Sequence, residues 1–240
     1  MRLFGNTAQP TLEPAPPGEG VDIPIRSEEI VMVRDPFSQV AEQFRRLRNS
    51  VQALNSDGAS RTVMMTSSIR GEGKTVASLN LGIALAELPQ MRVLILDADH
   101  ASARVEHYLG LPRRQGFTEV LQGRLPLDQA IRNTAIDRMD VMGAGSSPHN
   151  PADILNIDRI RSVLNAVKRR YDYILIDSPA ALTMNSPSVL GSLADGIILV
   201  VRLNSTPKMY VEEAYQLLEN LGGNILGTCL TDGTLPDAIR

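Results

Sequence analysis

Cysteine is almost absent from this chain of 240 residues, in which Cys229 is the only one. A single thiol excludes an internal disulfide bond and leaves no cysteine cluster for zinc. No apolar run approaches the roughly 18–20 residues that cross a bilayer, and the N-terminus lacks the apolar core of a signal peptide. We therefore expect a soluble, cytoplasmic protein that works at a membrane only if something else brings it there.

A strong charge of either sign is also missing, because the formal net charge is −3. This balance argues against a general nucleic-acid binder. A hydrophobic content of 43% is ordinary for a globular protein, and the length suits one α/β domain with a sizeable core. Lysine occurs only as Lys74, Lys168 and Lys208, so a lysine inside a glycine-rich turn is an informative feature.

The N-terminal part of the chain is rich in proline. Residues 1–27 hold five prolines and few large apolar groups, which predicts a flexible leader. Residues 28–240 are expected to form a single domain. Within it, residues 38–54 carry apolar side chains at spacings of three and four, which predicts an amphipathic helix.

From residue 62 onward the chain alternates between two patterns. Short apolar runs predict strands at 63–66, 93–96, 140–142, 173–176, 197–201 and 225–230. Helical patterns lie between them at 74–88, 125–132, 152–170 and 208–221. This alternation predicts an α/β fold, with a mostly parallel sheet and helices on both faces. Ligands of such sheets bind outside the carboxyl ends of the strands.

The most informative segment is residues 68–75, which read Ser-Ile-Arg-Gly-Glu-Gly-Lys-Thr. It follows a predicted strand and opens a predicted helix, as a phosphate-binding loop of a P-loop NTPase does. Backbone N–H groups and the helix dipole then converge on one anion. The residues expected to bind the nucleotide are Ser68, Arg70, Gly71, Glu72, Gly73, Lys74, Thr75 and Val76.

Within this loop Lys74 is expected to neutralise the outer phosphates, and the Thr75 hydroxyl to ligate Mg²⁺. Ser68 stands where the full motif has its first glycine, which a serine can replace if the backbone there does not need positive φ. The structural alternative is a surface loop whose glycines serve only the turn.

Carboxylates follow two of the predicted strands. Asp97 and Asp99 end one strand, and Asp177 ends another. Mg²⁺ takes one or two carboxylates alongside phosphate oxygens, so Asp177 is expected in the metal shell. Asp97 is a candidate base or second metal ligand, and Asp99 is expected to reach the metal or an incoming substrate. The alternative for each is a helix N-cap or turn residue.

With these motifs placed, the chain resembles the bacterial protein-tyrosine kinases of capsule and exopolysaccharide assembly, a branch of the Min- and Par-like P-loop ATPases. The resemblance covers roughly residues 35–230, and Ile69, where partitioning ATPases carry a signature lysine, favours the kinases. It implies an ATP- and Mg²⁺-dependent phosphotransferase, with Lys74, Asp97 and Asp99 as catalytic residues and Thr75, Asp97 and Asp177 as metal ligands. It also implies a homo-oligomer at the inner face of the cell membrane, held there by a membrane polysaccharide co-polymerase or activator.

The resemblance further extends to Glu42, Arg45 and Arg48, which match a Glu-x-x-Arg-x-x-Arg element that in the family contacts the nucleotide site of the neighbouring subunit. The chain departs from the family in its tail, because residues 231–240 hold no tyrosine. An asparagine usual near the last strand is replaced by Thr231 or Asp232. Two alternatives to a kinase therefore stay open, an ATPase switch and a nucleotide-binding scaffold without hydrolysis.

Overall fold

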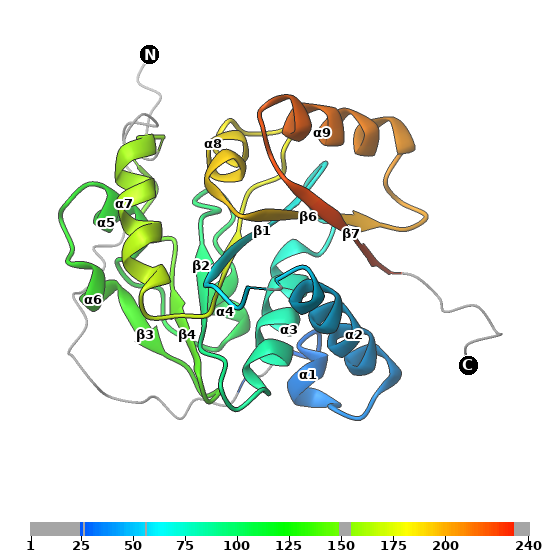
Figure 1. Cartoon of the computed structure of the whole chain (residues 1–240), viewed down its shortest axis with the longest axis horizontal. Coiled ribbons are helices and arrows are strands. Elements are labelled where there is room, and N and C mark those ends of the chain that lie inside the picture. Colours follow the sequence, from blue (N-terminus) through cyan, green and yellow to red (C-terminus); the bar gives the residue numbers. More distant parts are fainter. Residues whose placement is uncertain (1–24, 26, 56, 149–154, 233–240) are drawn as a thin grey trace, which may run out of the picture.

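A central sheet organises the protein. The computed structural model describes residue 25 and residues 27–55, 57–148 and 155–232, and their seven strands form one sheet in the order β3-β4-β2-β5-β1-β6-β7 (Figure 1). Every neighbouring pair is parallel except β3 with β4. The predicted mostly parallel sheet is thus confirmed. The strands are β1 (Arg61–Ser67), β2 (Val93–Asp97), β3 (Ile131–Asn133), β4 (Met139–Met142), β5 (Tyr173–Asp177), β6 (Gly196–Arg202) and β7 (Ile225–Thr231).

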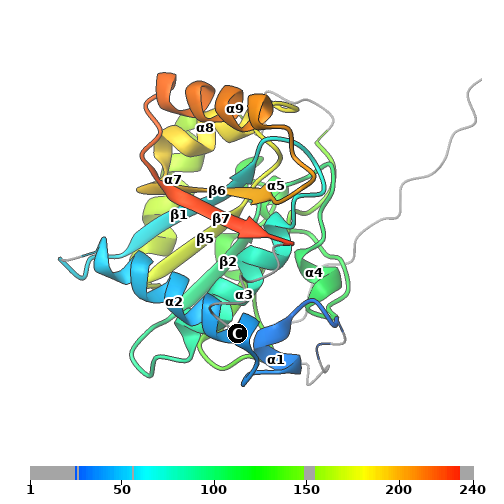
Figure 2. The ribbon, with the colours of Figure 1, turned by 90° about the vertical axis from the view of Figure 1, so that its right-hand side faces the viewer.

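Helices cover both faces of the sheet, as two separate hydrophobic clusters show. One face carries α1 (Val31–Arg34), α2 (Gln39–Ala53), α3 (Lys74–Ala86) and α4 (Val105–Tyr108). The other carries α5 (Phe117–Leu121), α6 (Leu127–Ala130), α7 (Ile157–Lys168), α8 (Ser186–Leu193) and α9 (Lys208–Asn220). Figure 2 shows α8 and α9 on the side of the sheet opposite to α1 and α2.

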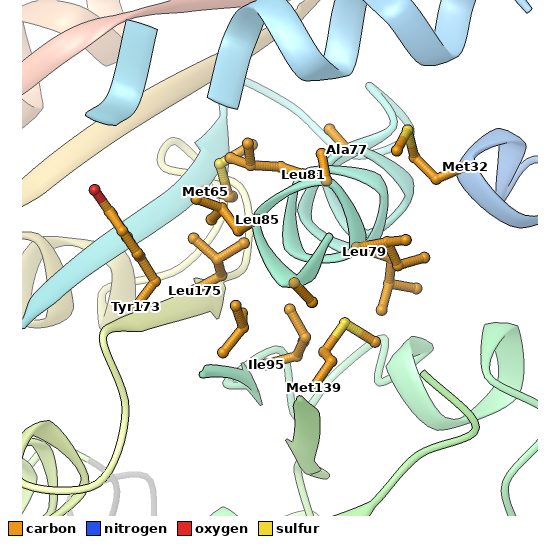
Figure 3. Close-up of a cluster of buried hydrophobic side chains, with 14 of the residues drawn as sticks. Met32, Met65, Ala77, Leu79, Leu81, Leu85, Ile95, Met139, Tyr173 and Leu175 are labelled. Carbon is orange, nitrogen blue, oxygen red and sulfur yellow. The ribbon is translucent and has the colours of Figure 1, made fainter. Parts of the chain in front are cut away.

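Helix α3 is apolar on nearly all sides because it lies between two layers. The sheet packs on one side of it, and α1 and α2 cover the other (Figure 3). The helix approaches the sheet closely at Gly82, where an added Cβ would lie 2.6 Å from the Ile95 side chain. Asn80 joins the layers, since its side chain accepts from the Met32 N–H and donates to the Glu29 carbonyl. This packing holds the N-terminal end of α3 in place.

Most predicted elements agree with the structure, and the differences are one helix end and several short elements. The predicted helix 125–132 is wrong at its end, because α6 stops at Ala130 and β3 begins at Ile131. Residues 131–133 are extended because they form antiparallel hydrogen bonds with β4. Helices α1, α4, α5 and α8 and strand β3 were not predicted, and part of the predicted helix 152–170 lies outside the described residues.

The predicted leader also lies outside the described residues, apart from its last positions. Ile25, near the end of that segment, is buried. Across the described ranges, no helix has both the length and the apolar character needed to cross a bilayer.

Candidate nucleotide-binding site

The turn between β1 and α3 has the backbone that a phosphate-binding loop needs. Gly71 and Gly73 both have φ +87°, a left-handed conformation that favours glycine. Ser68 is buried and is not among the residues with positive φ, so its backbone does not require the glycine that the full motif carries. The Ser68 hydroxyl has no hydrogen-bond partner within the described residues, which leaves a buried polar atom beside the loop.

The N-terminal end of α3 is open to an anion. Its N-cap is Gly73, which has no side chain to accept from the first-turn N–H groups. Lys74, the first residue of the helix, is buried and lies close enough to Asp177 to lower the pKa of that carboxyl. Uncapped N–H groups, the positive end of the helix dipole and a lysine together favour a bound phosphate.

A carboxylate at the end of β5 meets the start of α3. The Thr75 hydroxyl donates to Asp177 Oδ2 at 2.6 Å, and the Ser78 hydroxyl approaches Asp177 Oδ1 at 3.5 Å. Asp177 itself is buried. The structure thus joins two of the residues that the sequence predicted as metal ligands. Ser78 was not predicted, although its spacing of three from Thr75 puts both hydroxyls on one helix face.

Asp97 lies on the strand next to Asp177. The two aspartates pair in register across β2 and β5, and Asp97 is fully buried. Its carboxylate accepts from the Asp99 N–H at 3.0 Å and the Val105 N–H at 3.2 Å. Strand β5 lies between β2 and β1, so Asp97 is not on a strand that directly neighbours the one leading to Lys74. Asp97 lies beside the site because β2 pairs with β5, the strand that ends in Asp177.

The paired aspartates resist ionisation. Burial raises the pKa of Asp177 to about 6, against the opposing effects of the Thr75 hydrogen bond and the Lys74 charge. Burial also raises the pKa of Asp97 well above its ordinary value, and the Asp177 charge raises it further. Two carboxylates held together away from water favour a divalent cation, whose charge would offset both effects.

Glu72 holds the loop to the strands beside it. This buried carboxylate accepts from the Ile69 N–H at 2.9 Å, from the Arg202 N–H at 3.3 Å and from the Thr206 hydroxyl. The Thr231 hydroxyl donates to the Glu72 carbonyl at 2.8 Å. Glu72 stays a predicted nucleotide-binding residue through its place in the loop, while its carboxylate bonds to the protein. Three of these partners, Arg202, Thr206 and Thr231, lie more than a hundred residues along the chain, so no local pattern could indicate them.

Replacement of Glu72 by alanine is expected to loosen the loop. Three partly buried hydrogen bonds lose their acceptor, which should lower the free energy of unfolding by about 1–3 kcal/mol and weaken ATP binding measured by calorimetry. Arg70→Ala is the matched control for stability, because Arg70 is an exposed loop residue with no contact that the structure shows. Equal unfolding free energies for Glu72→Ala and wild type in urea would contradict this role.

The other predicted site residues lie around this centre. Asp99 is half-buried, accepts from the Ser102 N–H at 2.9 Å, and raises the pKa of Asp177 through its charge. Val76 is half-buried in the first turn of α3. Asp232, one candidate for the missing asparagine, forms an ion pair with Arg202 at 2.9 Å.

The predicted interface residues do not join this site within one chain. Arg45 and Arg48 both pair with Glu87, at 2.6 and 3.1 Å, directly after the C-terminal end of α3. A helix of 13 residues is roughly 18–20 Å long. The two arginines therefore lie far from their own phosphate loop, because the loop precedes α3 and the arginines lie at the other end of that helix. Glu42 is more exposed and lies 3.8 Å from Arg45.

The donor set fits a magnesium nucleotide. The open helix end and Lys74 suit phosphates, while Thr75, Asp97 and Asp177 provide the hard oxygen ligands that Mg²⁺ takes. In the described part of the chain no group of histidine, cysteine and acidic side chains forms a separate metal cluster.

The sheet, the loop before α3 and the carboxylates at the neighbouring strand ends define a P-loop NTPase. Residues 60–223 match the family model described as AAA domain, and the chain belongs to this family. Tyrosine-protein kinase YwqD of Bacillus subtilis (strain 168) is 28% identical over 201 residues, which is 84% of each chain. The kinase domain of Escherichia coli tyrosine kinase ETK superposes with a TM-score of 0.79 at 25% identity, over 86% of this chain and 82% of that one.

The chain is also similar to a solved structure from the wider group of Min-like ATPases. The septum site-determining protein MinD from Pyrococcus horikoshii OT3, solved with Mg-ADP, superposes with a TM-score of 0.61 at 25% identity, over 75% of each chain. The resemblance to bacterial tyrosine kinases among Min-like ATPases is thus confirmed. The relatives differ in length, since the match covers 84% of YwqD but 27% of tyrosine-protein kinase etk of Escherichia coli (strain K12).

Proposed function

We propose that this protein is an ATP- and Mg²⁺-dependent protein-tyrosine kinase that regulates the synthesis or export of a capsule or exopolysaccharide. The hydrogen bond from Thr75 to Asp177, with Lys74 and Asp97 beside it, carries the proposal. It joins a phosphate loop and an acidic strand end in the arrangement that phosphoryl transfer uses. The kinase names of YwqD and ETK support tyrosine as the acceptor.

Each residue has one task in this proposal. The loop N–H groups and Lys74 hold the phosphates, while Thr75 and Asp177 hold the metal ion. Asp97, whose pKa burial raises, accepts the proton of the attacking hydroxyl, and Asp99 orients the incoming group. Phosphoryl transfer depends mostly on positioning and charge stabilisation, so these few groups suffice.

Labelled ATP tests the proposal. Purified protein is incubated with γ-labelled ATP, Mg²⁺ and a synthetic glutamate–tyrosine copolymer, with Lys74→Met in parallel. Transfer of label to copolymer tyrosine, absent in the variant, is the expected result. Release of free phosphate without transfer would instead favour the ATPase switch, and retained ATP with neither product would favour the scaffold.

The ATPase switch is the second candidate because of one observation. Residues 231–240 hold no tyrosine, whereas members of the family that the chain resembles often carry a cluster of acceptor tyrosines in their tail. In this alternative the nucleotide state controls assembly with a membrane polysaccharide co-polymerase, and no protein is phosphorylated. The intact Lys74, Thr75, Asp97 and Asp177 argue for hydrolysis in both cases.

We also propose that the protein is a homo-oligomer that a membrane activator holds at the inner face of the cell membrane. Arg45 and Arg48 support an interface, since they lie too far from their own loop to serve it. A neighbouring copy would present its nucleotide site to these two arginines of α2. Glu42 belongs to the same proposed surface.

The double variant Arg45→Ala/Arg48→Ala is expected to dissociate the oligomer, measured by sedimentation velocity with ATP and Mg²⁺. Loss of these partly exposed ion pairs alone should cost less than about 1 kcal/mol of stability each. Glu87→Ala is the matched control, because it removes the same ion pairs and leaves both guanidinium groups available. If Glu87→Ala dissociates the oligomer as far as the double variant does, the arginines act only through Glu87.

A further inference from the structure

The tyrosines of this chain differ sharply in access to solvent. All five lie within the described residues. Tyr171 and Tyr173 are buried, and their hydroxyl groups bond to Asp140 and Asn55 inside the fold. Tyr108 is partly buried and packs against a core cluster. The hydroxyl groups of Tyr171 and Tyr173 are thus engaged inside the fold, and the Tyr108 side chain is held against the core.

The two exposed tyrosines both lie on α9. Tyr210 and Tyr215 are each 38% exposed, on a helix whose Ala214 and Leu218 are buried in the core. They differ in the state of the hydroxyl. That of Tyr215 donates to Glu219 Oε1 at 3.3 Å, beside a carboxylate that would repel a phosphate. That of Tyr210 has no hydrogen-bond partner among the described residues.

Tyr210 also lies near the edge of the sheet that holds the phosphate loop. Helix α9 follows the carboxyl end of β6, and the connection between them is bonded to the loop, where Thr206 donates to Glu72. Tyr210 comes four residues after Thr206 and belongs to the first turn of α9, with its N–H donating to the Pro207 carbonyl at 3.0 Å. First turns of helices fray easily, which would let the side chain enter a kinase site. Tyr215 lies five residues further along the helix, roughly 7–8 Å away from that edge.

We propose that Tyr210 is the principal tyrosine on which this protein phosphorylates itself. This inference rests on the proposed kinase function and names its acceptor. The Tyr210 hydroxyl oxygen would form a bond to the γ-phosphorus of ATP as the bond between that phosphorus and the β,γ-bridging oxygen breaks. ADP leaves, and the phenolic proton passes to a carboxylate or water. A phosphate there would add about −1.5 to −2 charges next to the connection that is bonded to the loop.

Phosphopeptide mapping tests the acceptor directly. Full-length protein, Tyr210→Phe, Tyr215→Phe and Tyr108→Phe are each incubated with labelled ATP and Mg²⁺, and the modified tyrosines are identified by mass spectrometry. We expect Tyr210→Phe to lose most of the phosphotyrosine and Tyr108→Phe to lose none. Phosphotyrosine that persists in Tyr210→Phe at the wild-type level would overturn the proposal.

The copolymer assay separates this inference from the proposed function. If the wild type labels the copolymer but never Tyr210, the kinase function stands and the acceptor assignment fails. If it labels neither, both fail. Tyr210→Phe should retain the copolymer activity, because the hydroxyl lies outside the nucleotide-binding residues.

A second measurement needs no nucleotide. Nitration of the native protein with tetranitromethane should modify Tyr210 readily and leave Tyr171 and Tyr173 unmodified. Resistance of Tyr210 to nitration would show that its ring is not available to a reagent, and would overturn the proposal on structural grounds.

Discussion

Lys74→Met is expected to lower the rate of ATP hydrolysis, or of phosphoryl transfer, by about a thousandfold. The reason is electrostatic, since Lys74 is buried at the start of α3 and supplies a full charge where the phosphates gather negative charge. A factor of about 10³ corresponds to roughly 4 kcal/mol of transition-state stabilisation. Methionine has a similar length and no charge, so the fold should persist. Phosphate release at saturating ATP measures the effect.

The matched control for this prediction is Lys208→Met. Lys208 is an exposed lysine at the start of α9 that pairs with Glu212. Its replacement removes the same charge from the protein and should change hydrolysis by less than about twofold, because exposed charges act weakly through water. A Lys74→Met protein that hydrolyses ATP at nearly the wild-type rate would remove the loop from the proposed mechanism.

Asp177→Asn is expected to abolish metal-dependent activity and, in the absence of ligand, to stabilise the protein. Asparagine keeps the shape of the side chain but takes a full charge from the metal shell, so activity should fall by about 10²–10³-fold. The pKa of Asp177 is raised to about 6 from 3.8, so its ionised form opposes folding at neutral pH. A shift of roughly two units corresponds to about 3 kcal/mol.

The stability difference between wild type and Asp177→Asn should depend on pH in a definite direction. Below about pH 4 the carboxyl is protonated in both the folded and the unfolded chain, and wild type and variant should be equally stable. Between about pH 4 and 6 the unfolded chain ionises first, so the wild type loses stability relative to the variant as the pH rises. The difference should reach its full size above about pH 6 to 7. Urea unfolding with EDTA and without nucleotide measures it.

Asp158→Asn is the control for the charge change. Asp158 is an aspartate whose side chain is 92% exposed, so its loss should alter neither activity nor stability noticeably. An Asp177→Asn protein that is less stable than wild type at pH 8 would mean that the hydrogen bonds of Asp177 to Thr75 and Ser78 outweigh the cost of its charge. Full activity of the variant would exclude Asp177 from the metal shell.

Much of the site was predictable because its signals are local. The loop glycines, Lys74 and Thr75 occur in one short segment between a strand and a helix, and Gly71 and Gly73 have the left-handed backbone that such a turn requires. Asp97 and Asp177 each end an apolar strand, and parallel strands bring their carboxyl ends to one edge of a sheet. Periodicity also indicated α2 and α9 almost to their ends.

Other features could not be read from the chain. The short strand β3 begins inside a segment predicted as a helix, and it is extended where β4 offers it an antiparallel partner. The hydrogen bonds of the Glu72 carboxylate also depend on segments that are distant in the chain. Its acceptor role depends on Arg202 and Thr206, which approach only after β6 lies beside β1.

The sequence by itself determined the class of fold, the phosphate loop and the presence of acidic strand ends, because the residues that indicate each feature are close together in the chain. Tertiary structure alone decided that β5 lies between β1 and β2, that Arg45 and Arg48 gather at the far end of α3, and that α9 carries the exposed tyrosines. Strand order and burial depend on how all the helices pack over the sheet at once. Packing of that kind joins distant segments and leaves no periodic pattern in any one of them.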